Sequence, residues 1–237
     1  MPHKAKRERP FSISEVLENI KWIKELPLSV QARITQEISE TAHEKGGVVA
    51  RLGDPARSWI YVEDGLLKLT ALDLDGKGIM YTSVSSGGWV GEGALIKREL
   101  RRYDIVAMRD SRLLHVPSAT FRWLLDTNLE FNSFVISLLN ERLSQYISMV
   151  EIERMQDPVA RVAKSLAVLY NPVLYPNMTA TVPLSQQELG ELAGLSRQSV
   201  SAALKQLQSK GYVTTEYGSV IVKDVNGLKN YVPDSSE

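Results

Sequence analysis

The chain has 237 residues, of which 43% are hydrophobic and 24% charged, a composition typical of a globular protein with material for two domains. Lys and Arg balance Asp and Glu at 28 each, so the net charge does not point to a nucleic-acid partner. The lack of cysteine excludes disulfides, iron–sulfur clusters and thiolate metal sites. The scattered histidines predict no metal site, and the lack of a long apolar run predicts a cytoplasmic protein without a membrane partner.

The first half of the chain changes from a helical to a β-type pattern near residue 47. Residues 11–45 have apolar positions at helical spacing, interrupted by Pro27 and ended by Gly46 and Gly47. Short runs rich in β-branched and aromatic residues follow, with turn residues between them. The runs lie at 59–62, 66–72 and 79–84, with turns at 63–65 and 75–78. This spacing predicts a sandwich or β-roll, and we assign residues 1–118 to N-terminal helices and a roll.

Residues 119–156 contain neither glycine nor proline and carry apolar side chains on more than one side of a predicted helix. A helix with two apolar sides has to bury both. The roll would cover one side, and the same helix of a second subunit the other. Leu139, Leu143, Tyr146 and Val150 have heptad-like spacing and predict this homodimer seam, with a core helix of a single chain as the alternative.

Asp157 and Pro158 mark the next boundary. Asp is a good N-cap and Pro is favoured at the first helical position, so a new helix is predicted to begin here. The residue before proline is also disfavoured in helical geometry, so the long helix is predicted to end. We therefore interpret Asp157 as a hinge and assign residues 157–237 to a separate domain.

Two helices joined by a tight turn are predicted within residues 183–223. Ser185 and Glu188 form a capping box, which begins a helix over residues 186–193. Gly194 suits a left-handed turn, and Ser196 caps a second helix. Helices joined by so short a turn cross steeply, so the second one projects from the domain.

The projecting helix, residues 197–209, has an outward face suited to double-stranded DNA. Arg197, Gln198, Ala202 and Lys205 lie on this face, and the helix contains no acidic residue. A projecting helix fits the major groove, with its first residues at the base edges and a basic side chain such as Lys205 at phosphate. Strand-like residues on both sides of a Tyr-Gly turn then predict a wing hairpin.

These segments resemble the CRP/FNR superfamily of bacterial transcription regulators. The resemblance rests on residues 184–224, on the hinge at Asp157, and on residues 88–106, where a G-E-x-x-L pattern precedes arginine. It implies an α+β homodimer with an N-terminal cyclic-nucleotide-binding-type β-roll, a long dimerisation helix over residues 119–156 and a C-terminal winged helix-turn-helix. It also implies RNA polymerase as a partner.

The resemblance also assigns DNA contacts to individual residues. Arg197 falls at a position that contacts guanine, whereas Gln198 and Ala202 replace a glutamate and an arginine at the other base-reading positions. Glutamine suits adenine and alanine can pack only on a thymine methyl, so we expect a palindromic operator that differs from the familiar one. The phosphate-contacting positions fall on Ser185, Gln187, Ser196 and Ser199.

The predicted roll matches the cyclic-nucleotide pattern only in part. By resemblance, Gly91 permits close backbone approach, Glu92 bonds ribose hydroxyls and Arg102 neutralises a phosphate. Tyr103 stands where a small hydroxyl residue is usual, and Tyr146 where a hydroxyl residue would meet adenine. A phenol fills space that the cyclic phosphate needs, which argues against cyclic AMP.

Three interpretations of the roll stay open. It could hold another effector, aromatic or acidic, with Arg102 as the anion partner and Trp89, Tyr103 and Tyr146 as walls. Its pocket could be filled, with Arg102 paired to Glu92, in an effector-independent regulator. It could also bind haem through a histidine. No histidine–carboxylate cluster, catalytic triad or phosphate-binding glycine loop stands out, so no enzymatic activity is predicted, and a ligand-binding module without DNA specificity is the rival class.

Overall fold

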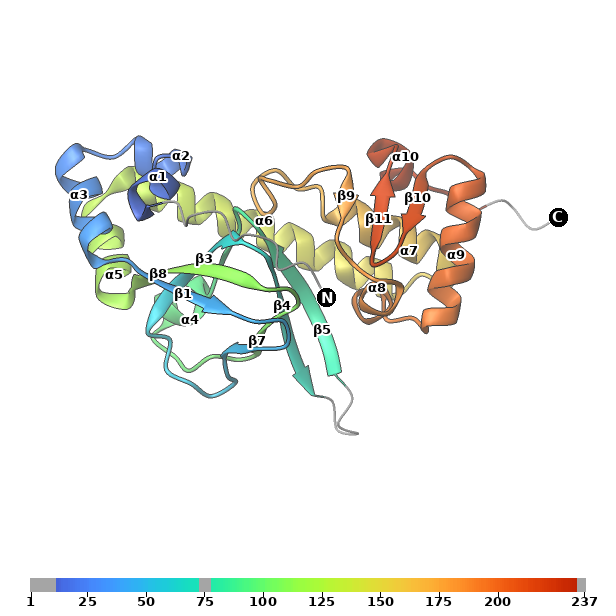
Figure 1. Ribbon diagram of the computed structural model, residues 1–237, viewed down its shortest axis with the longest axis horizontal. Helices are drawn as coiled ribbons and strands as arrows, with labels where there is room; N and C mark the ends of the chain where they lie inside the picture. Colours follow the sequence, from blue (N-terminus) through green and yellow to red (C-terminus); the bar gives the residue numbers. More distant parts are fainter. Residues whose placement is uncertain (1–11, 73–77, 234–237) are drawn as a thin grey trace, which may run out of the picture.

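The computed structural model describes residues 12–72 and 78–233, which form an elongated molecule with two lobes (Figure 1). The N-terminal helices and most strands form one lobe, and the C-terminal helices with a small sheet form the other. The helices are α1 (Ile13–Leu17), α2 (Lys21–Lys24), α3 (Leu28–Glu37), α4 (Glu92–Lys97), α5 (Ser118–Thr127), α6 (Leu129–Glu153), α7 (Pro158–Val168), α8 (Gln186–Ala193), α9 (Arg197–Ser209) and α10 (Val225–Lys229). The strands are β1 (Ser39–His43), β2 (Val48–Ala50), β3 (Ser58–Asp64), β4 (Leu66–Leu72), β5 (Gly78–Ser85), β6 (Trp89–Val90), β7 (Asp104–Ala107), β8 (Ser111–Pro117), β9 (Thr181–Val182), β10 (Val213–Glu216) and β11 (Ser219–Val222).

Two four-stranded antiparallel sheets form a β-roll in the first lobe, with strand orders β1-β8-β3-β6 and β2-β7-β4-β5. Side chains alternate along each strand, so one set from each sheet faces the interior. Buried aliphatic residues of both sheets meet there: Ile60, Val62, Leu67, Leu69, Ile105 and Leu113. The predicted α+β fold with an N-terminal β-roll is confirmed, and most of the predicted turn at 75–78 lies outside the described residues.

The N-terminal segment is helical only as far as Glu37. The sequence predicted helix up to residue 45, but Ser39–His43 forms β1 and pairs along its whole length with β8. Ile38 is already extended, with ψ 141°. The backbone groups of β8 would otherwise lack partners on that side, and satisfying them outweighs the weak helical pattern of this segment. Residue 11, where the prediction began, lies outside the described residues.

The predicted continuous helix over residues 119–156 is in fact two helices. Asn128 separates α5 from α6, with an extended backbone and a side chain that accepts a hydrogen bond from the Phe131 amide at 2.7 Å. Asparagine is a strong N-cap, so it begins a new helix without any glycine or proline. The break lets Phe121 of α5 and Phe131 of α6 pack together against the roll, and both are fully buried.

The second lobe begins at the predicted position. Pro158 is the first residue of α7, and the Asp157 carboxylate accepts a hydrogen bond from the Ala160 amide at 2.7 Å. Helices α8 and α9 have the predicted bounds, and β10 and β11 form the wing. Strand β9, which pairs with β11, and helix α10 were not predicted.

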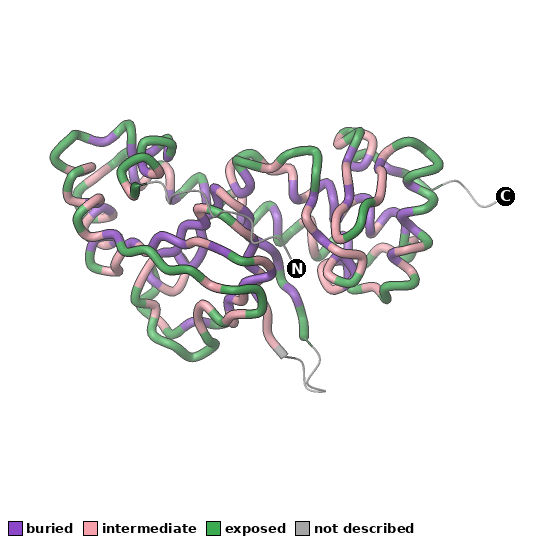
Figure 2. Tube along the Cα trace, in the orientation of Figure 1, coloured by how far each residue is buried: buried purple, intermediate pink, exposed green. Residues whose placement is uncertain are grey.

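The segment between α7 and β9 packs against the first lobe, and we call residues 171–178 the strap. Tyr175 at its centre is buried, and its hydroxyl lies 3.0 Å from Thr82 Oγ1 of β5 and 2.6 Å from Gln145 Nε2 of α6. Figure 2 shows buried residues concentrated in the roll, along the inner side of α6 and in the centre of the second lobe. No helix among the described residues is long and apolar enough to span a membrane.

Candidate nucleic-acid interface and effector region

A reciprocal capping box begins α8. The Ser185 hydroxyl accepts a hydrogen bond from the Glu188 amide at 3.3 Å, and the Glu188 carboxylate accepts one from the Ser185 amide at 2.8 Å. Glu188 also accepts two bonds from Arg109 of the roll, at 2.7 and 2.9 Å. Burial alone would raise the pKa of Glu188, but these hydrogen bonds outweigh it and lower the pKa to about 2. The carboxylate is therefore charged at neutral pH and links the two lobes.

The turn after α8 sets the direction of α9. Gly194 has a left-handed backbone with φ 64°, as the glycine in the sequence predicted. The Ser196 hydroxyl then accepts a hydrogen bond from the Ser199 amide at 3.1 Å and caps α9. Below this turn, Leu189 of α8 packs with the buried inner side of α9, which includes Val200. The packing beneath α9 thus keeps its other side at the surface.

The predicted base-reading residues all lie on that outer side. Arg197, Gln198 and Ala202 are exposed, as is Lys205 one turn further along. Arg197 also lines a hollow of about 650 Å³, which lies between the start of α8, the start of α9 and the wing.

The predicted phosphate-contacting residues divide between two helix N-termini. Ser185 and Gln187 lie at the start of α8 and line the same hollow as Arg197. Ser196 and Ser199 lie at the start of α9, where their hydroxyl oxygens are 2.9 Å apart. Helix N-termini present unsatisfied amide groups, which favour anions such as phosphate.

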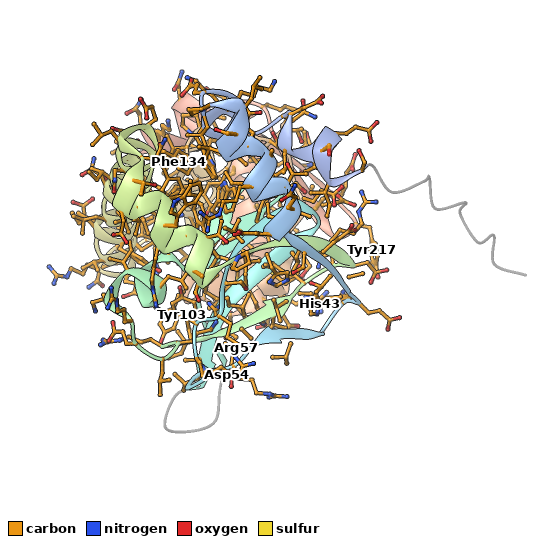
Figure 3. The ribbon with its side chains drawn as sticks, turned by 90° about the vertical axis from the view of Figure 1, so that its left-hand side faces the viewer. His43, Asp54, Arg57, Tyr103, Phe134 and Tyr217 are labelled. Atoms are coloured by element: carbon orange, nitrogen blue, oxygen red, sulfur yellow. The ribbon has the colours of Figure 1, made fainter. Side chains whose placement is uncertain are left out.

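Three residues of the hollow were missed in the sequence. Tyr217, at the tip of the wing, is fully exposed (Figure 3). Lys45 and Arg109 come from the roll and form its other wall. No local pattern could have identified the two basic residues, because only the contact between the lobes brings them here.

Glu92 of the predicted effector site is buried in an ion pair. One carboxylate oxygen lies 3.5 Å from Arg142 Nε of α6, and the other accepts a bond from the Trp59 indole at 3.4 Å. Arg142 also donates to the Trp89 carbonyl at 2.8 Å. Burial acts to lower the pKa of Arg142, but the neighbouring Glu92 carboxylate favours the charged guanidinium, and the pKa of Arg142 is raised. Arg142 was not identified in the sequence.

Arg102 does not lie in the predicted site, which corrects the sequence interpretation. Its side chain is 71% exposed and pairs with Glu99 at 2.7 Å. Arg101 is the buried arginine, and it donates to the Ser58 carbonyl at 3.0 Å. Gly91 has a φ of 101°, and a Cβ there would lie 2.7 Å from Arg101 Nη1, so glycine allows this close approach.

Tyr103, just before β7, and Tyr146 of α6, which is 36% exposed, lie beside the ion pair of Glu92 and Arg142. Burial raises the pKa of both phenols, and the nearby Glu92 carboxylate adds to the effect while Arg142 opposes it. Four groups thus interact with one another: Glu92, Tyr103, Arg142 and Tyr146. The structure therefore brings the predicted Glu92, Tyr103 and Tyr146 together around Arg142, with Gly91 directly before Glu92, and it places Arg102 outside this group.

The histidines give no sign of a metal site among residues 12–72 and 78–233, where no cluster of three or more potential ligands occurs. Burial lowers the pKa of His115 to about 4, so its ring is neutral at pH 7. Both ring nitrogens are engaged, one 2.8 Å from the Thr41 hydroxyl and the other 2.9 Å from the Ser58 hydroxyl. His3 lies outside the described residues.

A β-roll, a long helix and a winged helix-turn-helix together define a class of DNA-binding transcription regulators. Two domain families match the chain in this order, the cyclic nucleotide-binding domain over residues 40–128 and the Crp-like helix-turn-helix domain over residues 160–231. The chain belongs to the CRP/FNR superfamily of transcription regulators.

Similar proteins are themselves regulators. The cAMP-activated global transcriptional regulator CRP of Pasteurella multocida is 25% identical, over 72% of this chain and 83% of that protein. The transcriptional regulator SdrP of Thermus thermophilus is 28% identical, over 83% of this chain and 95% of its own length. The structure of FixK2 from Bradyrhizobium japonicum shares the fold, with a TM-score of 0.70 at 17% identity over 84% of this chain and 99% of that one.

Proposed function

We propose that this protein regulates transcription as a homodimer that binds a palindromic DNA operator through α9. The observation that carries the proposal is the exposed start of α9, where Arg197, Gln198 and Ala202 face outward from a helix that its own core holds in place. A protruding helix with a basic first residue suits the major groove, where arginine bonds guanine and glutamine bonds adenine. A cytoplasmic location and contact with RNA polymerase belong to the same proposal.

The phosphate contacts in this proposal come from the two helix N-termini and from the basic side of α9. Ser185 and Gln187 would hold the backbone at α8, and Ser196 and Ser199 would do so at α9. Lys205 is exposed on the same helix as Arg197 and would add a charge contact. Contacts of this kind position the protein without reading sequence.

An exposed apolar stripe on α6 supports the homodimer. The predicted seam consists of Leu139, Leu143, Tyr146 and Val150, which are 37%, 58%, 36% and 49% exposed. Ile136 and Ile147 extend the stripe at helical spacing and are also exposed. A contiguous apolar stripe is costly in water, and a second copy of α6 would cover it and bring two winged helices together.

The ion pair inside the roll bears on control by an effector. A ligand between the roll and α6 would have to displace or join the pair of Glu92 and Arg142, beside Tyr103. This arrangement favours an effector-independent regulator with a filled pocket, and it disfavours cyclic AMP. Control by another effector stays the alternative, through a shift between two dimer arrangements.

Selection of binding sites from a random DNA library with the purified protein, without added ligand, tests the proposal directly. We expect palindromic sites whose half-sites lie about one helical turn, ~34 Å, apart. Sedimentation of the same sample should give a dimer. Equal binding of selected and random duplexes at physiological salt, or a monomer at the concentrations used, would leave only a ligand-binding module without DNA specificity.

A further inference from the structure

A cavity of about 670 Å³ lies where the N-terminal helices, the roll, α6 and the strap meet. Its inner wall is aromatic, formed by Trp22 of α2, Tyr61 of β3, Trp89 of β6 and Phe134 of α6. The strap contributes Pro172 and other residues to the opposite side. A cavity of this volume suits a small molecule, because ligand sites typically measure ~300–1,000 Å³ and have mainly apolar and aromatic walls.

The aromatic wall is already assembled. The Trp22 and Phe134 rings stack at 5.6 Å with an interplanar angle of 21°, and Trp22 lies 5.8 Å from Trp89. Tyr61 and Trp89 are 4.9 Å apart. Three of these rings are nearly fully buried, so each is held by its neighbours. A ligand would therefore bind without first having to order the wall, which is a cost that weakens binding at mobile sites.

The rim of the cavity has an excess of negative charge. Its charged residues are Lys21, Glu25 and Glu130, all exposed. Within residues 12–72 and 78–233, no ion pair engages any of the three. Aromatic faces also attract cations, because the ring quadrupole places negative charge above the plane. Two carboxylates that have no ion pair among the described residues, against one lysine, thus favour positive charge on an apolar body at this aromatic wall.

We propose that this cavity is a binding site for an organic cation with an aromatic body, that is, an aromatic ammonium compound. Its ring would lie on the wall at Phe134, the least buried of the four rings, because Trp22 and Trp89 are only 4% and 3% exposed. Its ammonium group would lie at the rim, near Glu25 and Glu130. Binding of the cation does not depend on the proposed DNA function. Only an effect of the bound cation on DNA binding would rest on that function.

The cavity adjoins the polar group at Trp89, whose carbonyl accepts a bond from Arg142, but none of the four polar side chains lines it. Figure 3 shows Phe134 on α6 beside the N-terminal helices, well apart from Tyr103 in the lower part of the roll. The cavity also lies away from the proposed dimer stripe on α6. Phe134 and Leu143 are nine positions apart, which is two and a half turns at ~3.6 residues per turn, so they lie on opposite sides of α6. A homodimer through the stripe would leave the cavity open.

A bound cation would contact both lobes of the molecule. The strap approaches the turn between β5 and β6 so closely that a Cβ on Gly87 would lie 2.8 Å from Pro176 Cγ. Pro176, Gly87 and Trp89 all line the cavity. A ligand held there would favour the arrangement in which the strap is docked, and the strap leads into the winged helix-turn-helix.

Titration calorimetry of the full-length protein with two probes of opposite charge tests the site. The probes are 2-phenylethylammonium and 3-phenylpropionate, which carry the same ring. We expect one cation site per chain and at least roughly tenfold weaker binding of the anion. Equal affinity for both probes, or no saturable binding of the cation up to about 10 mM, would overturn the proposal.

Two variants and one control variant test whether the cation binds in this cavity. Glu25→Gln with Glu130→Gln changes only exposed side chains, and it should weaken cation binding about five- to tenfold. Glu44→Gln with Glu153→Gln removes the same charge from exposed positions outside the cavity and should leave the affinity unchanged. Phe134→Ala should weaken binding of the cation further, with thermal unfolding as the check on its fold. Unchanged affinity in the Glu25/Glu130 variant would refute the site even if the Phe134 variant fails to fold.

Discussion

The winged helix-turn-helix depends on contacts between residues close in sequence, whereas the interior of the β-roll depends on contacts between residues far apart in sequence. In the first, the hydrogen bonds that cap α8 and α9 join residues three positions apart, as Ser185 with Glu188 and Ser196 with Ser199 do. In the roll, Glu92 at the start of α4 accepts a bond from Trp59 of β3 and pairs with Arg142 of α6. The DNA-reading region is thus defined by neighbours in sequence, and the polar group of the roll by the tertiary fold.

This contrast has an energetic consequence. A lost cap costs one hydrogen bond at a surface, and water can take its place. A lost partner inside the roll leaves a charge that water does not reach. Substitutions in the roll should therefore affect folding most, and substitutions in the reading region should affect DNA binding most.

The largest effect is expected for Arg142→Ala. It would leave the buried Glu92 carboxylate without its counter-charge, and we expect the free energy of unfolding to fall by about 3–5 kcal/mol. Chemical denaturation at pH 7 measures this. Arg154→Ala is the matched control, because Arg154 is an exposed arginine at the end of the same helix. An equal loss in the two variants would show that the Glu92–Arg142 pair does not stabilise the roll.

Arg197→Ala should leave stability unchanged but weaken binding to a selected operator by about 1–3 kcal/mol, and it should relax the preference at one base pair per half-site. Binding to selected and scrambled duplexes at several salt concentrations measures both effects. Lys205→Ala provides the contrast, since a phosphate contact should lower affinity for all duplexes alike and reduce the salt dependence. If Arg197→Ala behaves in the same way, Arg197 is only a phosphate contact.

Much of the fold could be predicted from these local patterns, and the failures have physical causes. The bounds of α8 and α9 followed from the capping box, Gly194 and Ser196. The strand β1 was missed because its partner β8 lies far along the chain and decides its conformation. The break at Asn128 was missed because an asparagine N-cap leaves the apolar periodicity almost intact. Arg142 and Arg109 have partners that only the tertiary structure brings near.

The contact between the lobes should make stability depend on pH. The pKa of Glu188 is about 2 in the folded protein and 4.5 ordinarily, because its hydrogen bonds from Arg109 and Ser185 outweigh burial. A carboxyl with a lowered folded pKa stabilises the fold above its ordinary value, and this contribution is lost as the pH falls from 4.5 towards 2. Arg109→Gln should therefore lower stability at pH 7 by about 1–2 kcal/mol and reduce the loss on acidification.

Urea unfolding of both proteins at pH 7 and near pH 3 measures this difference. Lys68→Gln serves as the control, because Lys68 pairs with Glu191 of α8 at 2.9 Å and contributes to the same interface without contacting Glu188. In the Lys68→Gln control, the free energy of unfolding should depend on pH as it does in the parent protein. An unchanged pH dependence in Arg109→Gln would mean that the capping box alone lowers the pKa of Glu188.

The smallest effect is expected for Arg102→Ala, which tests the correction within the effector region. The resemblance assigned the phosphate-neutralising role to Arg102, but Arg98 ends α4 in a left-handed conformation with φ 56°, and Arg101 is the buried arginine before β7. Arg102→Ala should leave the melting temperature unchanged, because Arg102 is exposed and pairs only with Glu99 at the surface. Arg101→Ala should lower it clearly, since Arg101 is buried against Gly91 and Ser58. The reverse order would restore Arg102 to the roll interior, and with it the anion-binding role that the resemblance implies.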